Sequence, residues 1–343
     1  MTEQRLIEFD VLKFLAIFLV LWGHVILHLS DAPAAGNGMY NFISSFHMPL
    51  FMLVSGFFAS SSLKLPPRRF LSKKFFQLLW PCLSFGLLFL LLLAAIGLFD
   101  SRFSVGSFSL RGVAYYLWSG LWFLKSLFFC YAVLYVALAV CRGKSLWGGV
   151  LALAVSQIFP MFKVNSMFPF FLAGWCLSFN IDWLKAHIKA VFWVSLSVFA
   201  VFLYFLDAGI FSIMPEIKTR LLQGDFMAFK DLCHVNFYRF FLGLAGSLLV
   251  VSLVFMLLRH WHSRRLQSAM SRGGRQTLGI YIIQSFILET LMAQTMDFTC
   301  MDVYAFTYLL SPVLSLVLLF VCMYISERIR RWPRIGKQLF GQG

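Results

Sequence analysis

Long apolar runs follow one another along the whole chain and are separated by short polar connections. Each run holds roughly 18 to 25 mostly apolar residues, enough to cross a hydrocarbon core of about 30 Å as a helix. We predict ten such helices, at 9–29, 41–62, 75–99, 120–140, 145–161, 165–183, 189–210, 234–258, 277–296 and 303–325. Since no connection exceeds about two dozen residues, we expect a single membrane domain over 1–343 with no appended soluble domain.

Composition agrees with this pattern and excludes a water-soluble protein. Of the 343 residues, 60% are hydrophobic and only 13% are charged. Such a chain has too few polar side chains to cover a surface in water. The predicted fold class is therefore all-α, a polytopic integral membrane helical bundle.

The basic residues are placed unequally about the predicted helices. The net charge is +15, and 20 Lys and Arg residues lie in the head, the tail and the connections on the side of the N-terminus. The connections on the other side hold six, and three more lie within helices. Cytoplasmic segments carry this excess in membrane proteins, so we expect both termini in the cytoplasm. No basic stripe is left for nucleic acid.

The first predicted helix carries four ionisable residues. Asp10 and Lys13 share a face near the cytoplasmic end, where they can pair, and taken alone they favour a structural role. His24 follows Lys13 by eleven residues, about three turns, so both side chains lie on one side of the helix. A charged group at bilayer depth is costly and often marks function, which makes Lys13 and His24 candidates. His28, one turn farther on, is unexplained.

Four further candidates lie in the outer halves of other predicted helices: His47, Lys125, Arg239 and Glu289. His24 and His47 are each about five residues from the outer surface, so we expect the two imidazoles at similar depth. Five ionisable groups from five helices predict a polar chamber that could receive the acceptor. The alternative is that Arg239 or Lys125 pairs with Glu289 only to hold the helices together.

Several common catalytic patterns are missing from the chain. It has no HExxH, no Cys/His metal spacing, no GxSxG and no His-x4-Asp, so no metal is predicted. Cys233 and Cys300 are both expected near the outer surface, where a disulfide or two free thiols are the alternatives. What remains is an imidazole with cations on its cytoplasmic side. Imidazole can deprotonate a hydroxyl or be acylated itself.

Six stretches follow one another in an order and spacing that cover nearly the whole chain: FDVLKFLAIFLVLWGH, FHMPLFMLVSGFF, FFQLLWPCL, LWFL, FPFFLAGWCL and GRQTLGIYIIQ. Together they resemble the acyltransferase 3 family of membrane O-acyltransferases. The most specific element is a basic residue, ten residues and then a histidine in the first helix, which Lys13 and His24 match. The FHMPLF and SGFF stretch is nearly as specific.

The resemblance implies transfer of an acyl group, usually acetyl, from cytoplasmic acyl-coenzyme A, with acetyl-CoA as the expected cosubstrate. The acceptor would be a hydroxyl of an exopolysaccharide or other envelope glycan, or of its undecaprenyl-linked precursor, at the bacterial inner membrane. By position, His24 would be the catalytic imidazole, with Lys13 as its basic partner. Asp10 would be the acidic residue of the same motif, and His47 the histidine of the second motif.

The resemblance also implies a place for the donor on the Pro-containing basic loop 63–74. The family commonly has two basic residues there, and Lys74 matches the first. The residues expected to hold the phosphates are Arg68, Arg69, Lys73 and Lys74. Gln77 and Gln284 depart from the family, standing where a second basic residue and a histidine are usual. An appended SGNH hydrolase-like domain is also absent, which implies complete transfer by the membrane part alone.

Two readings from other classes use the same residues differently. A glycan transporter or flippase would use the polar chamber as a translocation path, and such proteins often contain internal repeats, which this sequence lacks. A membrane scaffold would use the buried charges only to fix helix packing. The order of the six stretches favours the enzyme over both.

Overall fold

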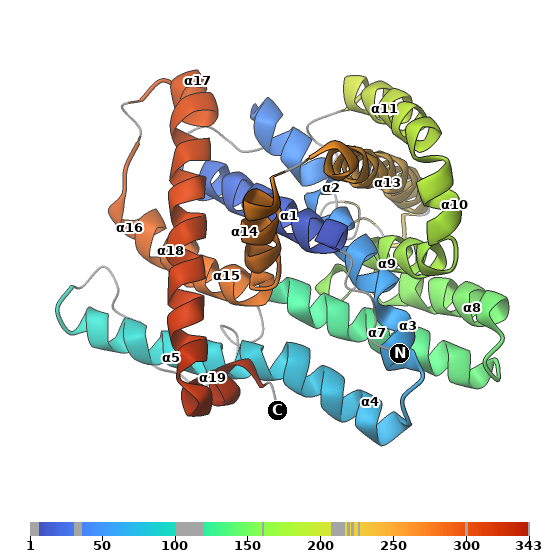
Figure 1. Cartoon of the computed structure of the whole chain (residues 1–343), viewed down its shortest axis with the longest axis horizontal. Coiled ribbons are helices and arrows are strands. Elements are labelled where there is room, and N and C mark those ends of the chain that lie inside the picture. The colour runs from blue at the N-terminus through green and yellow to red at the C-terminus, as the bar shows by residue number, and fades with distance from the viewer. Residues whose placement is uncertain are drawn as a thin grey trace. The chain divides into compact units, whose positions relative to one another are not determined.

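The computed structural model describes residues 7–30, 36–100, 120–159, 161–206, 217, 220, 223–225, 227–261, 263–298 and 301–341, with the side chain of Phe229 excepted. Within these ranges all regular elements are helices (Figure 1), as the apolar pattern predicts. The chain divides into two compact units. Unit 1 comprises residues 1–58, 169–277 and 297–317, and unit 2 comprises residues 59–168, 278–296 and 318–343. Cys300 lies outside the described residues, and so does its pairing with Cys233.

Helices occupy all ten predicted segments. Those of unit 1 are α1 (Ile7–Leu29), α2 (Gly38–Phe57), most of α9 (Val164–Phe179), α10 (Ile181–Ala186), α11 (Ile188–Tyr204), α13 (Met227–His260), α14 (Arg264–Gly274), α17 (Val303–Ala305), η7 (Phe306–Leu310) and the start of α18 (Ser311–Arg331). Those of unit 2 are α3 (Ala59–Leu63), α4 (Pro67–Lys74), η2 (Phe75–Leu79), α5 (Trp80–Gly97), α7 (Trp122–Val140), α8 (Ser145–Ile158), η4 (Met161–Lys163), α15 (Thr277–Gln284), η6 (Ser285–Met292), α16 (Ala293–Thr295), the rest of α18, and α19 (Pro333–Phe340).

Five continuous helices among the described residues are long and apolar enough to cross a membrane. They are Ile7–Leu29, Pro67–Gly97, Trp122–Val140, Lys230–His260 and Val303–Arg331. Two further apolar helices, Ser145–Ile158 and Ile188–Tyr204, are shorter than a full crossing. These helices identify a membrane protein, whereas ten crossings and two cytoplasmic termini stay predictions.

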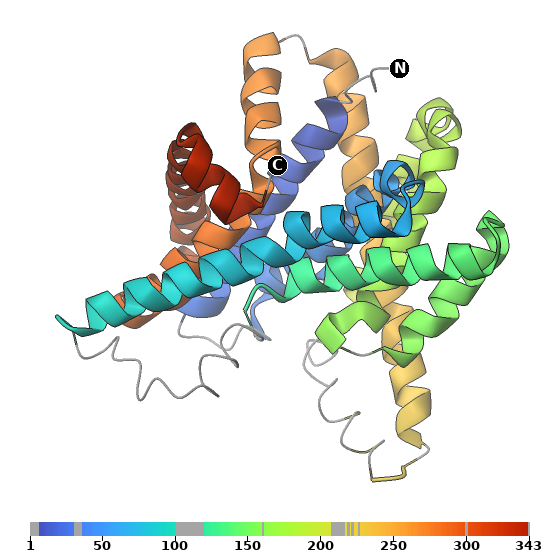
Figure 2. The same ribbon diagram turned by 90° about the horizontal axis from the view of Figure 1, so that it is seen from below.

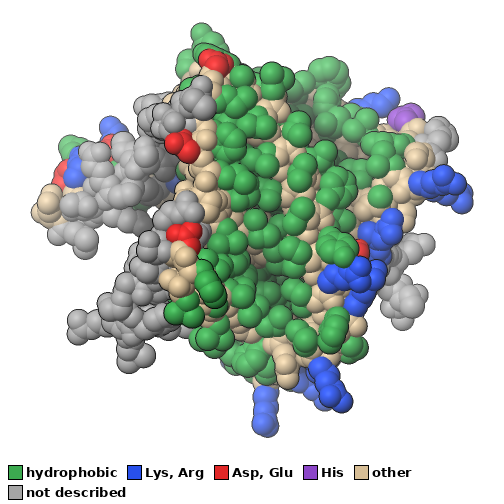
Figure 3. Space-filling model, turned by 90° about the vertical axis from the view of Figure 1, so that its left-hand side faces the viewer, with side chains coloured by type: hydrophobic (Ala, Val, Ile, Leu, Met, Phe, Trp, Pro, Cys, Tyr) green, Lys and Arg blue, Asp and Glu red, His purple; other side chains and the backbone are tan. Residues whose placement is uncertain are grey.

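The surface also suits a lipid environment. Val313, Val317, Phe320 and Tyr324 are each more than half exposed, and they recur along one side of α18 at helical spacing. Figure 3 shows a face on which hydrophobic side chains gather broadly, with Lys and Arg side chains along part of its margin. In water an apolar surface of this extent would promote aggregation, so we expect hydrocarbon to surround it.

Aromatic contacts at one end of unit 1 and a small residue at the other fix the packing of α1 against α2. The ring of Phe9 stacks on Phe57 at 4.2 Å between centroids and meets Phe255 of α13 edge-on at 5.8 Å. Toward the other end of α1, a Cβ on Gly23 would lie 3.4 Å from Cγ2 of Ile43. The beginning of α1 therefore lies beside the end of α2, and the two helices are antiparallel.

Two glycines allow α2 and α9 to approach each other at backbone distance. A Cβ built on Gly56 would overlap the carbonyl group of Phe171, and one built on Gly174 would overlap that of Leu53. Both positions are helical, so their glycines are needed for close approach and not for an unusual backbone angle. This reciprocal contact holds α2, with its histidine, against α9.

The segment 63–74, expected as a loop, is largely a helix. Pro67 begins α4 at a position where its missing N–H costs nothing and its fixed φ favours the helix. α4 continues through η2 into α5, and Figure 2 shows this continuous helix beside α7. The ring of Phe70 stacks on Tyr135 of α7 at 4.1 Å, and the Tyr135 hydroxyl donates to the carbonyl oxygen of Leu65. The basic residues of this segment are therefore arranged on a rigid element.

The α2–α9 contact gives a stability prediction. Gly56→Ala should lower the free energy of unfolding by about 1–3 kcal/mol, because the new methyl group overlaps a main-chain carbonyl that cannot rotate away. Thermal unfolding of the detergent-solubilised protein would measure the change. Gly38→Ala is the control, since a Cβ at Gly38 meets nothing within 4 Å. Equal midpoints for the two variants would contradict this packing.

Candidate functional site

Helix α14 packs against Asp10 at the beginning of α1. The Asp10 side chain is buried, and Oγ of Ser271 donates a hydrogen bond of 2.9 Å to its Oδ2. Three residues farther along α14, a Cβ on Gly274 would overlap the Asp10 carbonyl, so the two helices touch through their backbones (Figure 1). Lys13, on the next turn of α1, places Nζ 4.8 Å from the ring centroid of Phe58. Both candidates at this end of α1 are therefore in contact with protein groups.

The imidazoles of unit 1 lie on α1 and α2. The rings of His24 and His28 are neighbours on α1, with centroids 5.7 Å apart, and both side chains are half-buried. His47 is 8% exposed, and its Nδ1 lies 2.7 Å from the carbonyl oxygen of Ile43. A carbonyl can only accept, so Nδ1 of His47 donates, and in the neutral ring Nε2 carries the lone pair. That tautomer is the one a general base at Nε2 requires.

The packing register moves the two imidazoles apart in depth. The Phe9–Phe57 and Gly23–Ile43 contacts follow one antiparallel register, which places His47 opposite Leu19 and not opposite His24. Leu19 packs in the same cluster as Phe46, in agreement with this register. Five residues of helix amount to about 7.5 Å, so the expectation of equal depth is corrected by about a turn and a half. His47 lies at a level between Lys13 and His24.

Arg239 belongs to the face of α13 that packs on α2. Gly243, one turn later, would bring a Cβ within 2.8 Å of the Pro49 ring, and Gly246 would bring one within 2.6 Å of Phe46. Residues four apart share a helix face, so Arg239 continues this stripe. Unit 1 thus holds Asp10, Lys13, His24, His47 and Arg239 on helices that pack against one another.

Lys125 and Glu289, the other two chamber candidates, belong to unit 2. Lys125 is buried near the beginning of α7, where its Nζ donates a 2.6 Å hydrogen bond to the carbonyl oxygen of Gly120. Glu289 lies on η6 and accepts from Nε2 of Gln284 at 3.4 Å. Gln284 is fully buried, and its Oε1 has no hydrogen-bond partner among the described residues. A buried amide oxygen in this state is an acceptor that a ligand hydroxyl could satisfy.

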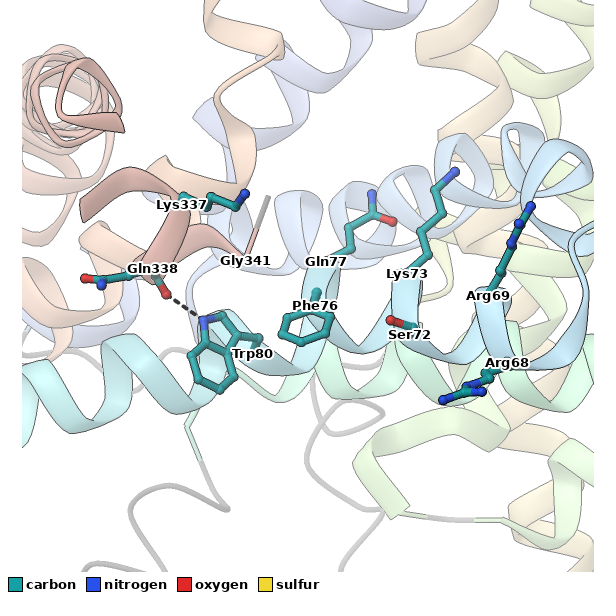
Figure 4. Close-up of a pocket in the computed structure, with 10 residues that line it drawn as sticks. All are labelled: Arg68, Arg69, Ser72, Lys73, Phe76, Gln77, Trp80, Lys337, Gln338 and Gly341. Atoms are coloured by element: carbon teal, nitrogen blue, oxygen red, sulfur yellow. Dashed lines mark hydrogen bonds between the residues drawn. The ribbon is translucent and has the colours of Figure 1, made fainter. Parts of the chain in front are cut away.

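A cavity of about 1090 Å³ lies at the junction of α4, η2 and α5 with α19, all within unit 2 (Figure 4). Its lining carries four cations and no acidic side chain. The lining residues are Arg68, Arg69, Ser72, Lys73, Phe76, Gln77, Trp80, Lys337, Gln338 and Gly341. Cations beside two aromatic rings suit an anion that also carries a flat ring system.

Three of the four residues expected at the donor phosphates line this cavity, and Lys74 does not. Lys74 is only 3% exposed, with Nζ 3.5 Å from the ring centroid of Tyr131. The same Nζ donates to Oε1 of Gln77 at 3.4 Å. A lysine in this position binds α4 to α7 through a cation–π contact. Its neighbour Lys73 is exposed and lines the cavity.

Sequence reasoning missed the aromatic rings and the residues of the C-terminal helix. In the sequence, Phe76 and Trp80 stand in an apolar run, and Lys337 is one of several basic residues in the tail. One signal could have found the first two: Arg69, Lys73, Phe76 and Trp80 follow the three- and four-residue spacing of one helix face. The approach of residues 337–341 to that face has no counterpart in local sequence.

The contact between Ser271 and Asp10 gives a prediction for Ser271→Ala. Losing a donor to a buried carboxyl group should cost about 1.5–3 kcal/mol of folding stability if the carboxyl is ionised. Intrinsic tryptophan fluorescence during heating would measure it. Ser252→Ala is the control, because Ser252 is also buried but its hydroxyl donates within its own helix, to the carbonyl of Leu249. If Ser271→Ala lowered the folding stability less than Ser252→Ala did, the hydrogen bond from Ser271 to Asp10 would not be a stabilising contact between α14 and α1.

Comparison with known proteins identifies the family. The acyltransferase 3 family, described as an acyltransferase domain, matches residues 6–328. A protein named nodulation protein NolL, from Mesorhizobium japonicum (strain LMG 29417 / CECT 9101 / MAFF 303099), is 26% identical over 310 residues, covering 84% of this chain and 78% of its own. No solved structure matches. Because the family match spans nearly the whole chain, the protein belongs to the acyltransferase 3 family and is a membrane acyltransferase.

Proposed function

We propose that the protein transfers an acyl group from cytoplasmic acyl-coenzyme A to a hydroxyl of a cell-envelope glycan or of its undecaprenyl-linked precursor. Acetyl is the group that the family resemblance favours. The proposed location is the bacterial inner membrane. The observation that carries the proposal is the cavity of unit 2, because its four cations and two aromatic rings match the chemistry of a coenzyme A nucleotide. The family match over residues 6–328 supports acyl transfer as the reaction.

The cavity has the size and the charge that the donor needs. Small-molecule sites commonly enclose about 300–1000 Å³, and this cavity, at about 1090 Å³, is slightly larger, which leaves room for an extended nucleotide. Arg68 and Arg69 can each donate two parallel N–H hydrogen bonds to a phosphate, while Lys73 contributes a point charge. The continuous helix Pro67–Gly97 has 31 residues, about 46 Å, so its basic first turns can extend beyond the hydrocarbon core.

In this proposal, the cavity holds the donor and the imidazole of His24 acts on the acceptor. His24 removes the proton of the acceptor hydroxyl as the oxygen attacks the thioester carbonyl. The tetrahedral intermediate then collapses, the C–S bond breaks, and the coenzyme A thiolate leaves and is protonated. In the alternative order, His24 is acylated first and passes the group to the hydroxyl. His47, whose Nε2 carries the lone pair, would take part in moving the proton.

The remaining candidates are proposed to meet the acceptor. Lys125, Arg239 and Glu289 can donate to and accept from sugar hydroxyls, which lack charge and are recognised by many hydrogen bonds. Gln284 adds its Oε1, which has no hydrogen-bond partner among the described residues, to this set. The glutamine in place of the family's usual histidine would then position the acceptor without exchanging a proton. Lys13 and Asp10 would hold the cytoplasmic end of α1 in place.

Replacement of His24 tests the chemistry. His24→Ala should lower the rate of acetyl transfer to glycan by about 100-fold or more, the usual contribution of a positioned general base. Release of coenzyme A thiol, with and without purified glycan, would measure it. His187→Ala is the matched control, because His187 is an exposed imidazole of unit 1 that stacks on Trp183. Wild-type turnover by His24→Ala would refute the assignment.

Replacement of Lys73 tests the donor cavity. Lys73→Gln should raise KM for acyl-coenzyme A by about fivefold and leave kcat nearly unchanged, since an exposed phosphate contact of about 1 kcal/mol stabilises ground and transition states equally. The control is Lys64→Gln, an exposed lysine of the same unit that does not line the cavity. If both variants changed KM alike, the effect would be general electrostatics and the donor would bind elsewhere.

A further inference from the structure

The C-terminal helix α19 is attached firmly to the helix that carries the basic residues. The indole N–H of Trp80 donates to the carbonyl oxygen of Gln338 (Figure 4), and the Ser84 hydroxyl donates to the carbonyl of Leu339 at 2.7 Å. The carbonyls at the end of a helix need outside donors, and these two side chains provide them. The end of α19 is therefore fixed on α5 by its main chain.

Phe340 and Gly341 complete the attachment. Phe340 is 1% exposed. Its ring centroid lies 5.1 Å from that of Phe85 and 4.3 Å from the guanidinium carbon of Arg330. Gly341 takes a left-handed φ of 63°, and a Cβ there would overlap the carbonyl of Phe76 in η2. Only glycine combines that backbone angle with that approach. The last turn of α19 is thus seated where the π-helical segment η2 lies.

This attachment makes α19 one wall of the cavity while its charged face stays open to solvent. Lys337 is exposed, and it faces the cavity together with Arg68, Arg69 and Lys73. The Gln338 carbonyl fixes the orientation of the Trp80 indole, whose ring is half-buried in the same lining. The family match ends at residue 328, so this wall lies beyond the region that identifies the family.

We propose that α19 is part of the donor site. Lys337 contributes a fourth phosphate-binding charge, and Trp80, oriented by α19, is the stacking surface for the adenine ring of coenzyme A. This inference rests on the proposed use of the cavity for acyl-coenzyme A. Phosphate chemistry alone would also suit an anionic lipid headgroup, but an indole and the ring of Phe76 beside the cations favour a nucleotide.

Binding measured by calorimetry on the full-length protein in detergent tests the charge. Lys337→Gln should weaken coenzyme A binding about fivefold, and Arg334→Gln should leave it unchanged. Arg334 is the matched control, since it is an exposed cation on the same helix that does not line the cavity. Both residues are exposed, so neither variant should shift the unfolding midpoint. An equal effect of the two substitutions would overturn the role of Lys337.

Two substitutions of Trp80 and two ligands test the stacking. Trp80→Leu should weaken binding of coenzyme A about tenfold and leave binding of phosphopantetheine, which lacks the nucleotide, unchanged. Trp80→Phe keeps an aromatic face but loses the bond to Gln338, so its loss should be intermediate. A parallel loss for both ligands in Trp80→Leu would show that the residue acts only on the fold.

The outcomes separate this inference from the function on which it rests. If Lys73→Gln weakened coenzyme A binding but Lys337→Gln and Trp80→Leu did not, α19 would be excluded and the donor cavity retained. If the wild-type protein did not bind coenzyme A, both proposals would be overturned. Binding of phosphatidylglycerol in nanodiscs that depended on Lys337, without binding of coenzyme A, would instead identify a lipid site.

Discussion

An ionisable side chain in an apolar helix must be given a polar or aromatic contact by the protein, because hydrocarbon cannot supply one. The arrangement of the candidate residues follows from this constraint. Asp10 accepts from a serine of α14, Lys74 lies over the ring of Tyr131, and Lys125 donates to the carbonyl of Gly120. The first two of these contacts also join different helices. The groups that suggest chemistry in the sequence therefore help to determine the helix packing.

The helices of the ten apolar segments could be predicted from sequence, whereas their packing and the short polar helices α4, α14 and α19 could not. Apolar length alone located all ten segments, since a helix is the only element that satisfies its own backbone in lipid. Gly56 and Phe171 lie more than a hundred positions apart in the sequence. The residues near Gly56 in the sequence do not indicate that it contacts Phe171. The depth of His47 could not be predicted either, because it depends on the register in which α2 packs along α1. The apolar pattern predicts that a helix is present. The register in which two helices pack depends on contacts between residues that are distant in sequence.

Lys73 and Lys74 show why the candidate site was only partly predictable. The two lysines are adjacent in one basic run, and their formal charges are the same. One helix position corresponds to a rotation of about 100°, which turns Lys73 to the cavity and Lys74 to the buried side against Tyr131. In a loop, all the cations of this run would be equivalent. Recognising the helix that begins at Pro67 separates a ligand-facing row from a packing residue.

The division of the chain into two units also divides the chemistry in the proposed reaction. Cations and aromatic rings supply affinity, and they do so equally well before and during the reaction, which suits the cavity of unit 2. A neutral imidazole supplies little affinity for a glycan but can accept a proton while the acyl bond forms, which suits the histidines of unit 1. The bond from His47 to the Ile43 carbonyl commits the neutral ring to one tautomer before any substrate arrives. In the proposed reaction, donor binding and proton transfer would therefore depend on different residues of the fold, and each set belongs to one unit.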